Sequence, residues 1–144
     1  MKSKFLKKTK VNKLTKDEIT MMSPLKLAYL GDSVFDLYIR TYLINKLKGK
    51  VNKINKTAIK YVNASSQGYI ARNLKEFLTK KEWRILKRGR NQKGSVPKNA
   101  NVSDYRYATG LEALIGFLYL KNRKERIMEI ISRGIDLINE KNKK

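Results

Sequence analysis

The chain has 144 residues, of which 34 are Lys or Arg and 12 are Asp or Glu, so its formal net charge is +22. This length is typical of one domain with a core of its own. Such a charge favours polyanionic partners, nucleic acid before an anionic membrane surface, although biased composition explains part of the lysine excess. Cys and His are both missing from the sequence. Disulfides, thiolate zinc sites, imidazole ligands and Ser-His-Asp triads are therefore excluded.

Residues 1–13 are rich in lysine and have no apolar periodicity, so we interpret them as a basic flexible tail. This segment is not followed by the apolar run that a signal peptide requires. The sequence also lacks a stretch of about 18 uncharged apolar residues, the minimum for a transmembrane helix. We therefore expect a cytoplasmic protein with a single domain at residues 14–144.

The first strong element is a long helix predicted from about residue 24 to 47. Ser23-Pro24 is typical of an N-cap followed by proline at the first helical position. Just before it, Thr15 and Glu18 have the spacing of a capping box. Apolar residues occupy so much of the circumference of the long helix that we expect burial on most sides.

Residues 51–78 continue with helical spacing, and Gly68 with the preceding serines predicts a joint between two helices. A second capping box, at Thr79 and Glu82, opens a short helix. Residues 87–101 then combine Gly, Pro and Asn with basic side chains and no acid. This composition predicts an exposed loop.

Two further helices are predicted, at about residues 103–121, capped by Ser103 or Asn101, and at about residues 123–140. Alternation typical of strands, glycine-rich phosphate motifs and internal repeats are not found. The expected fold class is all-α, with five to seven helices.

Three acids stand apart, whereas most of the others, Glu82 included, occupy positions typical of solvated carboxylates. Asp32 and Asp36 lie four residues apart in the first long helix, hence on one face. Glu112 is flanked by apolar residues on both sides. A buried carboxylate is costly unless it is paired or bound to a metal.

The residues alone leave two interpretations open. In the structural one, Asp36 pairs with Arg40 one turn later, Asp32 caps a neighbouring helix and Glu112 pairs with a buried arginine. In the functional one, the carboxylates hold a metal, and oxygen ligands without His or Cys suit Mg²⁺ or Mn²⁺. In so basic a protein, such a site indicates phosphodiester hydrolysis.

The segment LAYLGDSVFDLYIR, residues 27–40, resembles the signature helix of the ribonuclease III family, where an L-G-D-[AS] core precedes an acidic residue by four positions. LEALIG, residues 111–116, resembles the second motif of that family. The intervening KRGRN and VPKN, followed by YRYAT, resemble the Mini-ribonuclease III branch, a catalytic domain without an appended double-stranded-RNA-binding domain. The resemblance covers roughly residues 20–135.

The resemblance implies that Asp32 and Glu112 are the catalytic and metal-binding residues, and that Asp36 has a structural part with Arg40. Full-length ribonuclease III has two more acids, at positions held here by Ala28 and Thr109. The Mini-III branch also lacks these two acids. Two carboxylates do not fill an octahedral Mg²⁺ shell, so waters and substrate phosphate would complete it.

The resemblance further implies an all-helical ribonuclease III catalytic domain at residues 14–144 that forms a homodimer and cuts duplex RNA with Mg²⁺, or with Mn²⁺ as a substitute. It implies maturation of the 23S ribosomal RNA precursor, with a ribosomal protein on the substrate as a further partner. The two missing acids motivate an alternative, a non-catalytic RNA-binding or ribosome-assembly factor with the same fold. A DNA-binding protein is a third and weaker alternative.

The predicted loop supplies the candidate RNA-binding residues. Duplex RNA is contacted mainly through phosphates and 2′-hydroxyls, which suits a cationic loop, although a solvated linker has the same composition. The candidates are Lys87, Arg88, Arg90, Lys93 and Lys98. The following Tyr105, Arg106 and Tyr107 suit either base stacking or packing, and packing is favoured for at least one tyrosine.

Overall fold

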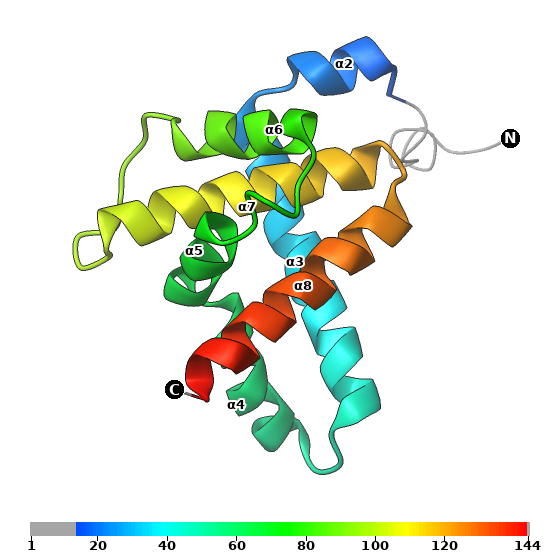
Figure 1. The fold of residues 1–144 in the computed structure, drawn as a ribbon, viewed down its shortest axis with the longest axis vertical. Helices are drawn as coiled ribbons and strands as arrows, with labels where there is room; N and C mark the ends of the chain where they lie inside the picture. The colour runs from blue at the N-terminus through cyan, green and yellow to red at the C-terminus, as the bar shows by residue number, and fades with distance from the viewer. Residues whose placement is uncertain (1–13, 144) are drawn as a thin grey trace, which may run out of the picture.

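The predicted all-α fold is confirmed for residues 14–143, the part of the chain that the computed structural model describes. The tail interpreted at residues 1–13 lies outside this part. The described residues contain no strand, and none of their helices is long and apolar enough to cross a bilayer. The helices drawn in Figure 1 are α2 (Lys16–Met21), α3 (Pro24–Lys46), α4 (Val51–Val62), α5 (Ala64–Arg72), α6 (Lys80–Arg90), α7 (Val102–Leu120) and α8 (Lys124–Asn142).

Helix α7 is the centre of the fold. It packs against α3, which passes behind it in Figure 1, and against α5 and α6 on either side. Leu111, Leu114 and Ile115 of α7 are fully buried by these neighbours. The two sequence motifs therefore lie on the most enclosed helix and on the long helix that crosses it.

Local signals set the starts of α2, α3, α6 and α7 as predicted. At Thr15 and at Thr79 the threonine hydroxyl accepts from the glutamate N–H three residues later, while that glutamate's carboxylate accepts from the threonine N–H. Ser23 caps α3 ahead of its first-turn proline, and Asn101 caps α7. Each cap satisfies backbone donors that the first turn of a helix leaves free.

The joint predicted near Gly68 lies instead at Asn63. Helix α4 ends at Val62, and the Asn63 side chain caps α5 by accepting from the Ser66 N–H at 2.8 Å. Gly68 is buried within α5, where a Cβ would lie 2.8 Å from the Cα of Asp104. This glycine therefore allows α5 to approach α7 closely and does not break the helix.

The loop predicted at residues 87–101 is shorter than expected. Helix α6 continues to Arg90, so Lys87, Arg88 and Arg90 belong to its last turn and the connection spans residues 91–101. Gly89 is buried against α7, because a Cβ there would lie 2.9 Å from the Cβ of Ala113. The glycine at position 89 therefore reflects tight packing between α6 and α7 and does not mark a loop.

Helix α3 is less buried than its apolar circumference predicts. Tyr29 is 86% exposed and Leu37 is 62% exposed, and Leu25 and Ile44 are exposed as well. The residues of one chain that the structure describes therefore leave a substantial apolar surface of α3 uncovered.

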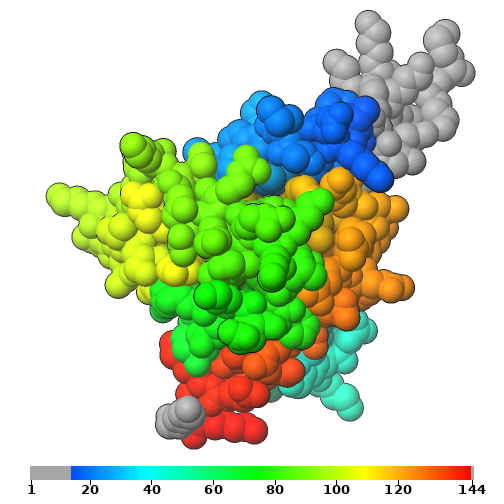
Figure 2. Space-filling model, turned by 45° about the horizontal axis from the view of Figure 1, so that its top comes forward, coloured from blue at the N-terminus to red at the C-terminus, as the bar shows by residue number. Residues whose placement is uncertain are grey.

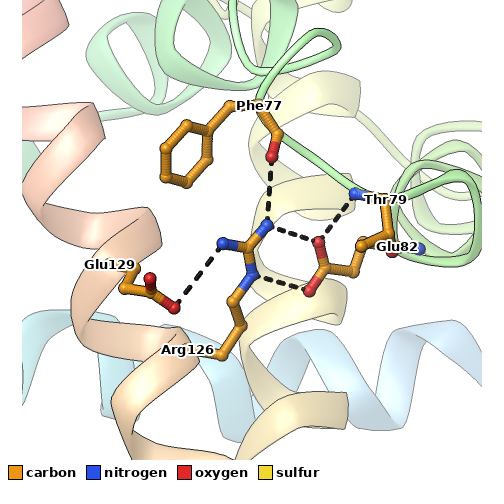
Figure 3. Close-up of polar contacts among 5 residues, drawn as sticks. All are labelled: Phe77, Thr79, Glu82, Arg126 and Glu129. Atoms are coloured by element: carbon orange, nitrogen blue, oxygen red, sulfur yellow. Dashed lines mark hydrogen bonds and ion pairs between the residues drawn. The ribbon is translucent and has the colours of Figure 1, made fainter.

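Glu82 is buried, contrary to the prediction that it is solvated, and it forms an ion pair with Arg126 of α8. Arg126 donates from Nε to Oε2 at 2.9 Å and from Nη2 to Oε1 at 2.8 Å (Figure 3). Its Nη2 also donates to the Phe77 carbonyl at 3.0 Å, and Glu129 lies 3.6 Å from its Nη1. We name this arrangement the Glu82–Arg126 clasp, and it joins α8 to the start of α6.

The electrostatics of the clasp follow from its partners. Burial alone would raise the pKa of the Glu82 carboxyl, but hydrogen bonds from Arg126 and from the Thr79 backbone outweigh burial and hold this pKa below its ordinary value. The same interaction raises the pKa of Arg126. The clasp is therefore a fully charged, internally neutralised pair.

Candidate active site

The crossing of α3 and α7 positions the two candidate catalytic carboxylates. Gly31 and Gly116 meet at this crossing, where a Cβ on Gly31 would collide with the carbonyl oxygen of Glu112. A Cβ on Gly116 would likewise collide with the carbonyl oxygen of Leu27. Because glycine has no Cβ, the two backbones can touch, and this contact brings Asp32 next to Glu112.

Asp32 and Glu112 interact directly. Asp32 is exposed on α3, and Glu112 is partly buried on α7. Burial, together with a hydrogen bond to Asp32 and the negative charge of Asp32, raises the pKa of Glu112 to about 9. Within residues 14–143 no arginine forms a salt bridge with Glu112, so the alternative of a buried arginine partner is wrong.

The donor set of this site fits a divalent cation. Two carboxyl groups converge, and when ionised they supply the hard oxygen ligands that Mg²⁺ and Mn²⁺ prefer. In the described part of the chain, no group of three or more Asp, Glu, His or Cys side chains is placed to hold a metal. Ala28 is buried, and the Thr109 hydroxyl donates to the Tyr105 carbonyl at 3.0 Å, so neither position adds a carboxylate.

Asp36 lies one turn beyond Asp32 on α3 and points to Arg40. The Arg40 Nε lies 2.9 Å from Asp36 Oδ2, which is the ion pair expected from the spacing. The Arg40 side chain is 59% exposed, so solvent weakens the pair. Asp36 therefore has Arg40 as its ion-pair partner.

The structure separates the five candidate RNA-binding residues. Arg90 and Lys93 line one open hollow of about 790 Å³, which we call the α6–α7 hollow, together with Asn91, Val102, Ser103, Arg106 and Tyr107. Lys87, Arg88 and Lys98 do not line it. Tyr107 packs partly against the core, as predicted for at least one of the tyrosines.

The sequence analysis did not identify Arg72 as part of this region. Its guanidinium carbon lies 5.4 Å from the centroid of the Tyr107 ring, and its Nη2 lies 2.6 Å from Asp104 Oδ1. No sequence signal marks this contact, because it joins the end of α5 to the start of α7. The basic region therefore includes residues from three helices as well as the connection.

Comparisons with known proteins agree with this fold. A family model of the ribonuclease III domain matches residues 25–123. The Mini-ribonuclease 3 of Clostridium tetani is 46% identical over 128 residues, which cover 88% of this chain and 85% of that protein. The Mini-ribonuclease 3 of Staphylococcus aureus is 44% identical over 128 residues, which cover 87% and 96%. The crystal structure of protein FN1578 from Fusobacterium nucleatum aligns with a TM-score of 0.74 at 36% identity, covering 85% of this chain and 98% of that one.

The chain therefore belongs to the ribonuclease III family, whose members are double-strand-specific endoribonucleases. The relatives from Clostridium tetani and Staphylococcus aureus carry the name Mini-ribonuclease 3, so the resemblance to that branch is confirmed. The described residues contain no appended RNA-binding domain, in agreement with that branch.

Proposed function

We propose that this protein is a Mg²⁺-dependent endoribonuclease that cuts double-stranded RNA at the Asp32–Glu112 site. The observation that carries the proposal is the convergence of these two carboxylates, each from one family motif, at the glycine crossing of α3 and α7. The strongly positive chain provides the attraction for a polyanionic substrate.

Asp32 and Glu112 would hold the metal ion, which when bound would supply a Lewis acid that activates water and stabilises the leaving oxygen. The crossing at Gly31 and Gly116 fixes the spacing of the two carboxylates through backbone contact. Glu112 has a raised pKa, so its proton would compete with the cation for the same carboxylate. Basic residues of α6 and of the connection would neutralise backbone phosphates and position the duplex.

The finer parts of the proposal follow the resemblance to Mini-ribonuclease III. We propose that the substrate is the 23S ribosomal RNA precursor in the cytoplasm, with a ribosomal protein on the RNA as a further partner. Mn²⁺ is expected to replace Mg²⁺, since both accept carboxylate oxygens. The whole catalytic domain would lie within residues 14–144. Mapping new RNA ends after incubation with precursor ribosomal RNA tests the substrate.

The exposed surface of α3 supports a homodimer. Leu25 and Tyr29 lie one turn apart, are 46% and 86% exposed, and share a helix face with Asp32. A second copy covering this face would bring two active sites near each other, one for each strand. Analytical ultracentrifugation tests this, and sedimentation as a monomer at micromolar concentration would contradict it.

The decisive experiment is cleavage of duplex RNA in Mg²⁺, with EDTA as a control. Asp32→Asn and Glu112→Gln should each lower turnover about a thousandfold, since each removes part of a metal site that contributes several kcal/mol to the transition state. Asp36→Asn is the matched control on the same helix face and should retain turnover. Full turnover in either active-site variant would refute the assignment.

One observation favours a second function, a non-catalytic RNA-binding or ribosome-assembly factor. Ala28 and Thr109 leave the site with two carboxylates, and the described residues offer no third acid beside them. A pure protein that binds duplex RNA but never cuts it in Mg²⁺ or Mn²⁺ would support this second function and reject the first.

A further inference from the structure

The partly buried arginines differ in whether a carboxylate neutralises them. Arg126 pairs with Glu82, and Arg133 lies 3.9 Å from Glu140. Arg90 and Arg106 are also only partly exposed. Yet within residues 14–143, neither of these two forms a salt bridge with any carboxylate. Burying a cation without an anionic partner is unfavourable, so these two positions require an explanation.

Neutral acceptors hold both guanidinium groups in place. Arg90 donates from Nη1 to the Tyr107 hydroxyl at 3.2 Å and from Nε to Asn91 Oδ1 at 3.0 Å. Arg106 donates from Nη1 to the Gln92 carbonyl at 2.7 Å. Because none of these acceptors carries a full charge, each arginine is oriented while its positive charge stays available.

Tyr107 connects this pair to a third arginine. The guanidinium carbons of Arg90 and Arg72 lie 5.3 and 5.4 Å from the centroid of the Tyr107 ring. Arg72 is neutralised by Asp104 at 2.6 Å, so its contribution here is to hold the ring. The ring in turn supports Arg90, which makes Arg90 more rigid than a side chain on an exposed loop.

Arg90 and Arg106 both line the α6–α7 hollow, with Lys93 and Ser103. In Figure 2 the connection at residues 91–101 lies at the projecting left edge of the molecule. Arg106 also lines a second hollow of about 170 Å³ that reaches Thr109, three residues before Glu112. Arg106 and Glu112 are separated by a rise of about 9 Å along the axis of α7, at 1.5 Å per residue.

We propose that Arg90 and Arg106 form a preorganised phosphate subsite for a backbone phosphodiester of the substrate strand, beside the Asp32–Glu112 site. Arg72 and Tyr107 are positioning residues for Arg90. This inference rests on the proposed function for the identity of the polyanion. Arginine suits the task because its planar donor fork matches two phosphate oxygens and remains charged. The affinity of the basic region is thus concentrated at two residues, while Lys87, Arg88 and Lys98 add only general attraction.

The test is the binding of a fluorescently labelled RNA duplex in EDTA over a range of salt concentrations. Arg90→Gln and Arg106→Gln should each weaken binding about tenfold or more. Each should also reduce the slope of log K against log salt by about one, as expected for one lost phosphate contact. Arg84→Gln, at an exposed position of α6, is the matched control and should change binding far less. Equal effects in all three variants would overturn the subsite.

Thermal melting checks that each variant is folded. Arg90→Lys and Arg106→Lys keep the charge and lose the fork, so each should bind more weakly than the parent and more tightly than its glutamine counterpart. Lysine variants that bind as well as the parent would show that charge alone is sufficient, which would contradict a built subsite.

A double-variant cycle tests the positioning role. Arg72→Gln should weaken binding in the parent protein but have little further effect in an Arg90→Gln background, because Arg72 acts through Arg90. Equal losses in both backgrounds would contradict that role. Tyr107→Phe, which keeps the ring and removes the hydroxyl acceptor, should give a smaller loss than Arg90→Gln.

Cleavage assays separate this inference from the proposed function. If the parent protein cuts duplex RNA and the Arg90 and Arg106 variants bind and cut like the control, the subsite is wrong and the proposed function stands. If the parent binds through Arg90 and Arg106 but never cuts, the subsite stands and the proposed function is wrong.

Discussion

Two glutamates on neighbouring helices, the buried Glu82 of α6 and the partly buried Glu112 of α7, have opposite electrostatics. Glu82 meets a guanidinium, and its pKa is lowered. Glu112 meets another carboxylate, and its pKa is raised to about 9. Burial acts in the same direction at both sites, so the partner decides the difference. A neutralised carboxylate supports the fold, whereas a carboxyl group beside another carboxylate favours its protonated form.

The largest effect on stability is expected when the guanidinium of Arg126 is removed from the clasp. Arg126→Met should lower the free energy of unfolding by about 3 kcal/mol, because it leaves the buried Glu82 carboxylate without its partner. Urea unfolding measures this, and adding Glu82→Gln to the variant should recover part of the loss. An unchanged unfolding midpoint in Arg126→Met would show that the two glutamates do not differ as described.

The next largest effect is the change of stability with pH that Glu112 causes in metal-free buffer. An acid whose folded pKa is raised favours the folded state while protonated, so its contribution is lost as pH rises from its ordinary value of 4.5 towards about 9. Stability measured in EDTA should therefore decline across this range by about 1–2 kcal/mol, a figure reduced for partial solvent exposure. Glu112→Gln should remove the decline. A profile that is identical in both proteins would mean that the two carboxylates do not interact.

Glu82 should give the opposite pH dependence. Its folded pKa is lowered, so its stabilising contribution is present above its ordinary value of 4.5 and is lost as pH falls through the folded value. The loss should be of order 1 kcal/mol in denaturant titrations at successive acidic pH values. Glu82→Gln should flatten this part of the curve, and an unflattened curve would place the acid-sensitive group elsewhere.

The smallest effect is expected at Asp36. Asp36→Asn should destabilise the protein by about 0.3–0.5 kcal/mol, since its partner Arg40 is exposed and one helical turn away. Chemical unfolding measures the change, and Arg40→Gln should match it. A stable Asp36→Asn variant that no longer cuts RNA would instead place Asp36 within the catalytic machinery.

Features fixed by neighbouring residues could be predicted from the sequence. Both capping boxes, the Ser23-Pro24 start of α3 and the Asp36–Arg40 pair depend on residues within one turn. Asp32 and Glu112 stood out as acids on apolar helices and then matched two family motifs, although their contact depends on the crossing of two helices. The catalytic and RNA-binding roles of the site residues remain predictions.

Features fixed by distant residues could not be predicted. Glu82 has the local pattern of a solvated capping residue, and its ion-pair partner, Arg126, comes 44 positions later. Gly68 and Gly89 gave the signal of a joint and a loop, because the sequence does not distinguish a glycine in a turn from one pressed against another helix. The contact of Arg72 with Tyr107 was missed because it joins two helices that are far apart in the sequence.

The clasp also has a consequence for synthesis of the protein on the ribosome. Helix α6 leaves the exit tunnel well before α8, so Glu82 has no ion-pair partner until Arg126 has been translated. Contacts between segments so far apart form late, because the closing of the intervening loop must come first. We expect nascent chains that end before residue 126 to remain sensitive to proteolysis around α6, and release of α8 to end that sensitivity.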